Sequence, residues 1–137
     1  RTSLELSKTS GLDWRLLEEL GLASELAGKT QDARSFLEQV IEFFTSRQVM
    51  DFPPTTATAL AKLYENEGSL ERAADMFRAL SRGSDTDKHA LYHYEAGRLL
   101  GAAGLGDEAR RMLTRADALV SDDDASLKDQ IAALLRG

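Results

Sequence analysis

Two histidines spaced four residues apart, His89 and His93, are the first side chains to test for metal chemistry. The spacing places both rings on one face of a helix, as in the HExxH zinc motif. Ala90 stands where that motif has its general-base Glu, and Glu95 is a nearby carboxylate that could take its place. Because no third ligand follows at a fixed spacing, we expect neither a metal site nor catalysis here.

Two further stretches invite a ligand and favour a structural interpretation instead. The segment SDDDAS, residues 121–126, lacks the alternate acidic spacing, the central Gly and the terminal Glu of a calcium loop, so it indicates a helix cap. The segment GAAGLG, residues 101–106, follows no predicted strand and indicates a turn between helices rather than a phosphate loop. We therefore expect a non-enzymatic protein with no cofactor.

Composition limits the partners. The 137 residues, 42% apolar and 29% charged, are typical of one water-soluble domain. A net charge of -6 repels phosphate backbones, so we expect no nucleic-acid partner. No stretch approaches the roughly 20 apolar residues of a membrane helix, so we expect no membrane partner. The chain has no Cys, which favours a reducing compartment, and the cytoplasm is our expectation.

A pattern that occurs three times predicts the elements that carry these residues: a Gly followed five residues later by an Ala. The pairs are Gly28 with Ala33, Gly68 with Ala73, and Gly104 with Ala109. Apolar residues follow each Ala at steps of three, four and seven, which is one face of a helix. Each Gly therefore separates two helices of a hairpin, and we expect the three alanines to be buried where the helices cross.

The small residues have a conformational and a packing reason. A Gly at a helix C-terminus adopts the left-handed conformation without a Cβ penalty. Thr30, Ser69 and Asp107 follow the three glycines and are candidate caps for the next helices. Gly21 and Gly97, seven residues before a turn, allow two helices to approach closely.

Local chemistry places the helix boundaries. We expect first helices at about 12–27, 54–67 and 87–103, second helices at about 30–47, 69–82 and 106–120, and a closing helix at about 125–136. Pro53 and Pro54 suit a helix entry. We expect a single domain over 1–137 with repeats at about 12–47, 54–82 and 87–120. Because the chain begins at Arg1 without an initiator Met, we also expect a longer parent protein.

This pattern of helical hairpins with small residues resembles the tetratricopeptide repeat (TPR) family, whose units are about 34 residues long. The resemblance covers about residues 12–120. It implies an all-α, right-handed solenoid of three TPR-like hairpins plus a C-terminal capping helix. Leu17, Ala57 and His93 occupy the position of an aromatic usual in the family, so His93 is also interpreted as a packed replacement for that ring.

The resemblance also implies that the chain binds a protein or peptide partner on the concave side, which the first helices line. On those helices the candidate partner-binding residues are Arg15, Glu18, Leu22, Glu25, Thr58, Lys62, Glu65, Leu91, Tyr94 and Arg98. Lys62 and Arg98 are expected to lie near one another, free to meet acidic or carbonyl groups of a partner. Glu18 and Leu22 occupy positions of the family's carboxylate clamp, which indicates that this clamp is absent.

Two questions stay open from the sequence. Phe44 and Phe52 flank the long loop after the first hairpin and have the best claim among the aromatics to exposure. The alternative function is a structural or self-association segment of a longer solenoid, without a peptide ligand of its own. The identity of a partner does not follow from these residues.

Overall fold

The computed structural model describes residues 13–49, 51–83 and 86–136, and all secondary structure in these ranges is helical. The α-helices are α2 (Asp13–Leu26), α3 (Thr30–Ser46), α4 (Pro54–Asn66), α5 (Leu70–Leu80), α6 (His89–Ala102), α7 (Gly106–Leu119) and α8 (Ala125–Arg136), and a short 3-10 helix, η1 (Thr86–Lys88), precedes α6. Their bounds lie within a few residues of the predicted ones. Residue 12, the predicted start of the first helix, lies outside the described residues.

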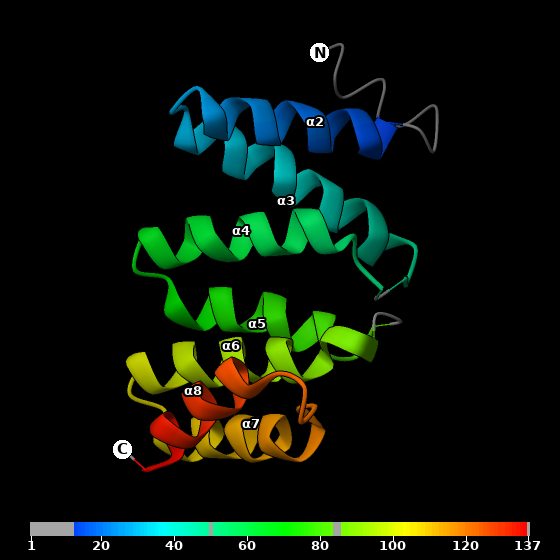
Figure 1. The fold of residues 1–137 in the computed structure, drawn as a ribbon. Coiled ribbons are helices and arrows are strands. Elements are labelled where there is room, and N and C mark those ends of the chain that lie inside the picture. The colour runs from blue at the N-terminus through cyan, green and yellow to red at the C-terminus, as the bar shows by residue number, and fades with distance from the viewer. Residues whose placement is uncertain (1–12, 50, 84–85, 137) are drawn as a thin grey trace.

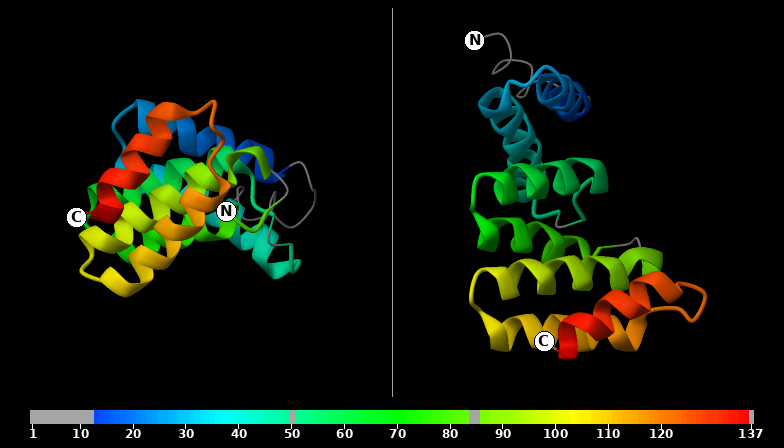
Figure 2. Two further views of the ribbon diagram at one scale, coloured as in Figure 1. Left: turned by 60° about the horizontal axis from the view of Figure 1, so that its bottom comes forward. Right: turned by 60° about the vertical axis from the view of Figure 1, so that its left-hand side comes forward.

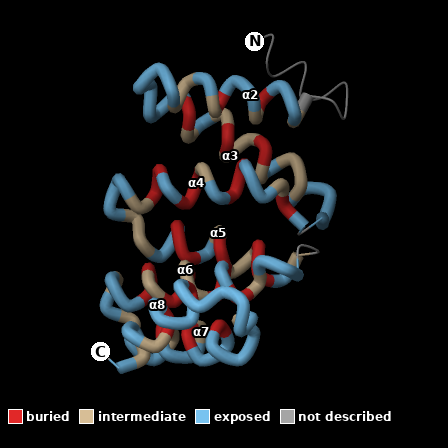
Figure 3. The backbone as a smooth tube through the Cα atoms, viewed as in Figure 1, coloured by how far each residue is buried: buried red, intermediate tan, exposed pale blue. Residues whose placement is uncertain are grey.

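The helices stack in a single column in chain order (Figure 1). Each helix packs against the next, and α8 lies obliquely across α6 and α7 (Figures 1 and 2). The predicted all-α solenoid of three hairpins and a closing helix is confirmed. Buried residues follow the inner sides of the column (Figure 3).

The three hairpin turns are built alike. Gly28, Gly68 and Gly104 all adopt the left-handed conformation, with φ of 79°, 84° and 85°. In the first turn the Gly28 N–H donates to the Glu25 carbonyl and the Lys29 N–H donates to the Ser24 carbonyl at 2.8 Å, and the other two turns repeat this pair of bonds. This arrangement is the Schellman motif, and it explains why a Gly ends each first helix.

The predicted side-chain caps at Thr30, Ser69 and Asp107 are wrong. The N-cap residues are Lys29, Ser69 and Leu105, and none makes a side-chain cap hydrogen bond. Their ψ angles of 75°, 68° and 68° lie outside the extended conformation usual for an N-cap, because the same residue also completes the preceding turn. A carboxylate cap does occur at α8, where Asp124 Oδ1 accepts the Leu127 N–H at 3.3 Å.

Small residues permit the close helix crossings. Ala33, Ala73 and Ala109 are buried, as predicted. A Cβ added at Gly21 would lie 2.7 Å from Leu37 Cγ, and one added at Gly97 would lie 2.7 Å from Leu113 Cγ. The leucines of the second helices therefore fill the space that a side chain at these glycines would need.

The two aromatic residues that flank the long loop pack against other side chains. Phe52 is buried in the main core, so the expectation that it is exposed is wrong. Phe44 is half-buried, and its ring packs edge-on against Trp14 with 5.1 Å between centroids. The loop between α3 and α4 thus contributes a core side chain of its own.

The two junctions between hairpins differ. The contact of α3 with α4 is smaller than the contact of α5 with α6. Polar bonds cross the first junction, where the Tyr64 hydroxyl donates to Glu38 and Arg34 pairs with Glu67 at 2.8 Å. Aromatic packing marks the second junction, where the Phe77 and Tyr92 rings lie 6.3 Å apart.

Candidate partner-binding groove

A groove of about 570 Å³ crosses the first helices of all three hairpins. The helices α2, α4 and α6 run in the same direction in the column (Figure 1), and the groove is open to solvent across them. Seven of the ten candidate residues line it: Leu22, Glu25, Thr58, Lys62, Glu65, Leu91 and Arg98. The repeat register therefore brings most of the predicted residues to one surface.

Three candidate residues lie elsewhere. The Arg15 guanidinium lies over the Trp14 ring, 4.9 Å from its centroid. Glu18 accepts a hydrogen bond from the buried Thr56 hydroxyl, which joins α2 to α4. Tyr94 packs into the cluster that α8 forms with α6 and α7. The first two are engaged within α2 or between helices, and α8 packs against the face of α6 that carries Tyr94. The lining of the groove therefore does not include these three, and their role in partner binding stays a prediction.

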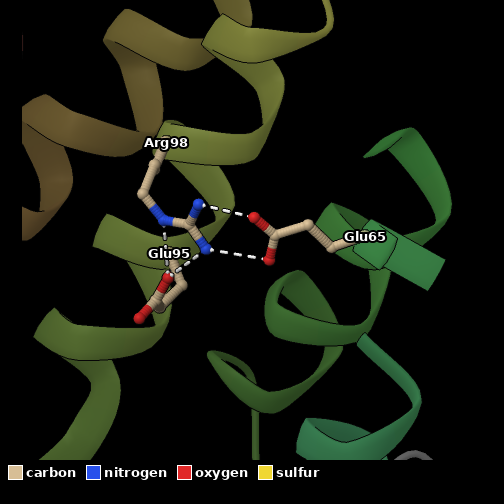
Figure 4. Close-up of polar contacts among 3 residues, drawn as sticks. All are labelled: Glu65, Glu95 and Arg98. Atoms are coloured by element: carbon tan, nitrogen blue, oxygen red, sulfur yellow. Dashed lines mark hydrogen bonds and ion pairs between the residues drawn. The ribbon is translucent and has the colours of Figure 1, made fainter. Parts of the chain in front are cut away.

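Arg98 is held by two carboxylates on the groove wall (Figure 4). Its Nη1 and Nη2 donate to the two oxygens of Glu65 at 2.9 Å and 3.2 Å, across the gap between α6 and α4. Its Nε and Nη2 also lie 2.9 Å and 2.8 Å from Glu95 Oε1 on its own helix. The hydrogen bonds that Arg98 donates to Glu65 lower the pKa of Glu65 and raise the pKa of Arg98.

We expected Lys62 and Arg98 to lie near one another with their charges available to a partner. For Arg98 this expectation is wrong. Its guanidinium already satisfies two carboxylates and ties α4 to α6, so it acts first as a structural residue. Lys62 is exposed and makes no ion pair or hydrogen bond with any described residue. Of the two, Lys62 is the one without an ion pair, although its charge helps to lower the pKa of Glu65.

The floor of the groove is apolar and was only partly predicted. The buried rings of Phe77 and Tyr92 lie beneath the more accessible Ala59 and Leu91. Phe77 belongs to a second helix, so a search of first-helix faces could not find it. Lys88 lies in the predicted first helix at 87–103, three residues before the candidate Leu91, so the same helical spacing could have found it. Glu95 could have been found from its three-residue spacing to Arg98 on one helix.

The histidines take structural positions. His89 Nε2 lies 2.9 Å from the Gly83 carbonyl oxygen. His93 is buried, and its Nδ1 has no hydrogen-bond partner within the described part of the chain. Burial lowers the pKa of His93, and the charges of Arg115 and Arg82 act in the same direction. His93 thus fills the position of the missing aromatic as a neutral ring.

Metal-ligating side chains do not gather within the described ranges. Across residues 13–49, 51–83 and 86–136, no group of three His, Asp or Glu side chains is placed to hold a metal ion. The absence of a metal in the protein stays a prediction. Likewise, no helix in these ranges has both the length and the apolar character needed to span a bilayer.

Stacked helical hairpins with this turn and this packing define a TPR-like helical-repeat fold. A solved structure with the same arrangement is the N-terminal domain of stress-induced protein-1 (STI-1) from C. elegans, at a TM-score of 0.68 and 16% sequence identity. The similarity covers 94% of this chain and 96% of that one. The sequence matches no protein-family model and no curated protein. At this identity the similarity supports the fold alone.

Proposed function

We propose that the chain is a single interaction domain that binds a segment of a partner protein in the groove across α2, α4 and α6. The observation that carries the proposal is the groove itself, an open surface of about 570 Å³ with an apolar floor and charged walls. Apolar area with a few convergent polar groups is the usual composition of a binding site. The fold adds support, because helical solenoids use extended concave surfaces for binding.

A bulky side chain at Thr58 tests the proposal. Thr58 is exposed and lines the groove, so Thr58→Trp fills part of it without disturbing the core. Thr114 is an exposed Thr on α7 outside the groove, so Thr114→Trp is the matched control. The immobilised wild-type chain and both variants are incubated with an extract of the source organism, and the retained proteins are identified.

We expect a partner that the wild type and Thr114→Trp retain and that Thr58→Trp loses. Circular dichroism on each variant establishes that the helices are intact. Retention of the same proteins by Thr58→Trp would show that binding uses another surface.

Self-association is a second candidate, and exposed leucines on α2 favour it. Leu16 and Leu20 are 42% and 38% exposed on the first helix of the column. Their four-residue spacing makes an apolar stripe on the side of α2 next to the buried Leu17. Sedimentation analysis of the wild type and of Leu16→Glu distinguishes the candidates. Self-association requires a concentration-dependent oligomer that Leu16→Glu dissociates, whereas the groove proposal requires no oligomer.

A further inference from the structure

Three charged side chains line the groove without an ion pair. Lys62 on α4, Lys88 before α6 and Glu25 on α2 all contribute to its walls. None of the three makes a hydrogen bond or an ion pair with another residue of the described ranges. Glu65 and Glu95, in contrast, share the charge of Arg98. The charge of Lys62 also helps to lower the pKa of Glu65, so Lys88 and Glu25 are the two groove charges that this ion-pair network leaves open.

Two pairs of residues at equivalent repeat positions differ: Glu65 and Arg98 form an ion pair, and Glu25 and Lys62 do not. Glu65 and Arg98 lie three and six residues before Gly68 and Gly104. Glu25 and Lys62 occupy the same two positions before Gly28 and Gly68. The Arg pair closes through two bonds because a guanidinium matches a carboxylate in fork geometry, which a Lys ammonium does not do. Glu25 and Lys62 thus occupy the equivalent positions in the preceding hairpins without forming an ion pair.

The free charges are separated along the groove. Lys88 lies sixteen residues before Gly104 and Glu25 lies three residues before Gly28. A difference of thirteen register positions corresponds to about 20 Å along the helix axes, at about 1.5 Å per residue. Lys88 is at the N-terminal end of a first helix and Glu25 is near the C-terminal end of another.

The helices reinforce this polarity. Because α2, α4 and α6 run in the same direction (Figure 1), their dipoles place positive charge at the end with Lys88 and negative charge at the end with Glu25. Leu91 and Ala59 supply the apolar floor between the two ends. The groove is therefore polarised, with an apolar centre.

From this arrangement we infer that the groove binds a partner segment of matching polarity. The segment carries an acidic side chain for Lys88, an apolar side chain for the floor, and a basic side chain for Glu25. Because the segment also crosses from α2 to α6, the span is at least about 20 Å, which corresponds to at least about six extended residues. This inference rests on the proposed function and adds the chemistry and the orientation of the bound segment.

The test begins with a phage-displayed library of random 12-residue peptides, panned on the wild-type chain. We expect selected sequences in which an apolar residue separates an acidic side from a basic side in one consistent order. The best peptide is then synthesised with both termini blocked, so that only side-chain charges remain. Its affinity is measured by fluorescence anisotropy for the wild type, Lys88→Glu, Glu25→Lys and the control Lys29→Glu, an exposed lysine in the first hairpin turn.

We expect each groove reversal to weaken binding by about fivefold, the upper range for one exposed ion pair. Lys29→Glu should leave the affinity unchanged. A peptide with its acidic residue exchanged for Lys should regain affinity for Lys88→Glu and lose it for the wild type. This exchange identifies the direction in which the segment lies.

The inference is overturned if no peptide is selected, if the selected peptides lack the opposite charges, or if both groove reversals bind as the wild type does. The variant Thr58→Trp then distinguishes a failure of the inferred polarity from a failure of the proposed groove. If Thr58→Trp loses peptide binding, the groove is the binding surface and only the inferred polarity is wrong. Full binding by Thr58→Trp removes the groove as well.

Discussion

Removing the Arg98 guanidinium is expected to destabilise the domain by about 1–2 kcal/mol. Arg98→Met keeps the aliphatic stem and leaves Glu65 and Glu95 facing each other without a cation. A single exposed ion pair contributes about 0.2–1 kcal/mol, and a bidentate pair within a network contributes more. The side chains of Arg98 and Glu65 are 35% and 36% exposed, so solvent screening keeps the value at this modest level.

Thermal unfolding followed by circular dichroism measures this loss. For a domain of this size about 1 kcal/mol corresponds to about 4 °C, so the melting temperature should fall by about 4–8 °C. Lys62→Met is the matched control, because Lys62 has the same register position in the preceding hairpin and no ion pair in the described ranges. Its effect should remain within about 0.5 kcal/mol. An Arg98→Met variant that melts with the wild type would refute the reasoning.

The pH dependence gives a second readout of the same ion pair. Arg98 lowers the pKa of Glu65 below its ordinary value of 4.5. The stabilisation is therefore fully present above pH 4.5 and is lost as the pH falls through the lower pKa of the folded state. The difference between the wild type and Arg98→Met should shrink in this acidic range. A difference that is constant between pH 7 and pH 3 would show that Arg98 stabilises by packing alone.

Four further variants test the core and the turns by urea unfolding. Ala73→Leu should cost about 1–3 kcal/mol, because Ala73 is fully buried at a helix crossing and the extra atoms have no space. Gly68→Ala should cost about 1 kcal/mol because φ is 84°, whereas Gly106→Ala, with open space for a Cβ and no positive φ, should be neutral or stabilising. His93→Phe should reduce the loss of stability on going from pH 7.5 to 5.5, because burial lowers the pKa of His93 and the unfolded chain takes up a proton near pH 6.5 that the folded chain resists. An unchanged pH dependence in His93→Phe would contradict the lowered pKa of His93. A destabilising Gly106→Ala would contradict the explanation of the turn by the positive φ of Gly68.

The repeated backbone features were predictable because each depends on local conformation. A Gly before an amphipathic run predicts a left-handed turn, and all three glycines adopt it. The small residues at Gly21 and Gly97 predicted close crossings because a Cβ there has no room. These inferences need only the residues of one hairpin.

Apart from the side-chain caps, the wrong predictions concern contacts between hairpins or the path of a loop. Arg98 finds Glu65 thirty-three residues away, and no rule of helix periodicity reports such a partner. Tyr94 has the register of a groove residue but packs against α8 outside the groove lining, and the docking of α8 depends on tertiary packing. Phe52 lies in a loop whose path the helical pattern does not determine. The groove was therefore located from the sequence, whereas its free charges required the structure.

The junction between α3 and α4 is smaller than the junction between α5 and α6, and we expect the column to open there first. In a solenoid each hairpin is stabilised mainly by its neighbours, so the weakest junction opens before the rest of the stack unfolds. Amide hydrogens of α2 and α3 should consequently exchange sooner than those of α6 and α7. Since α2 contributes Leu22 and Glu25 to the groove, we expect such an opening to change the width of the groove.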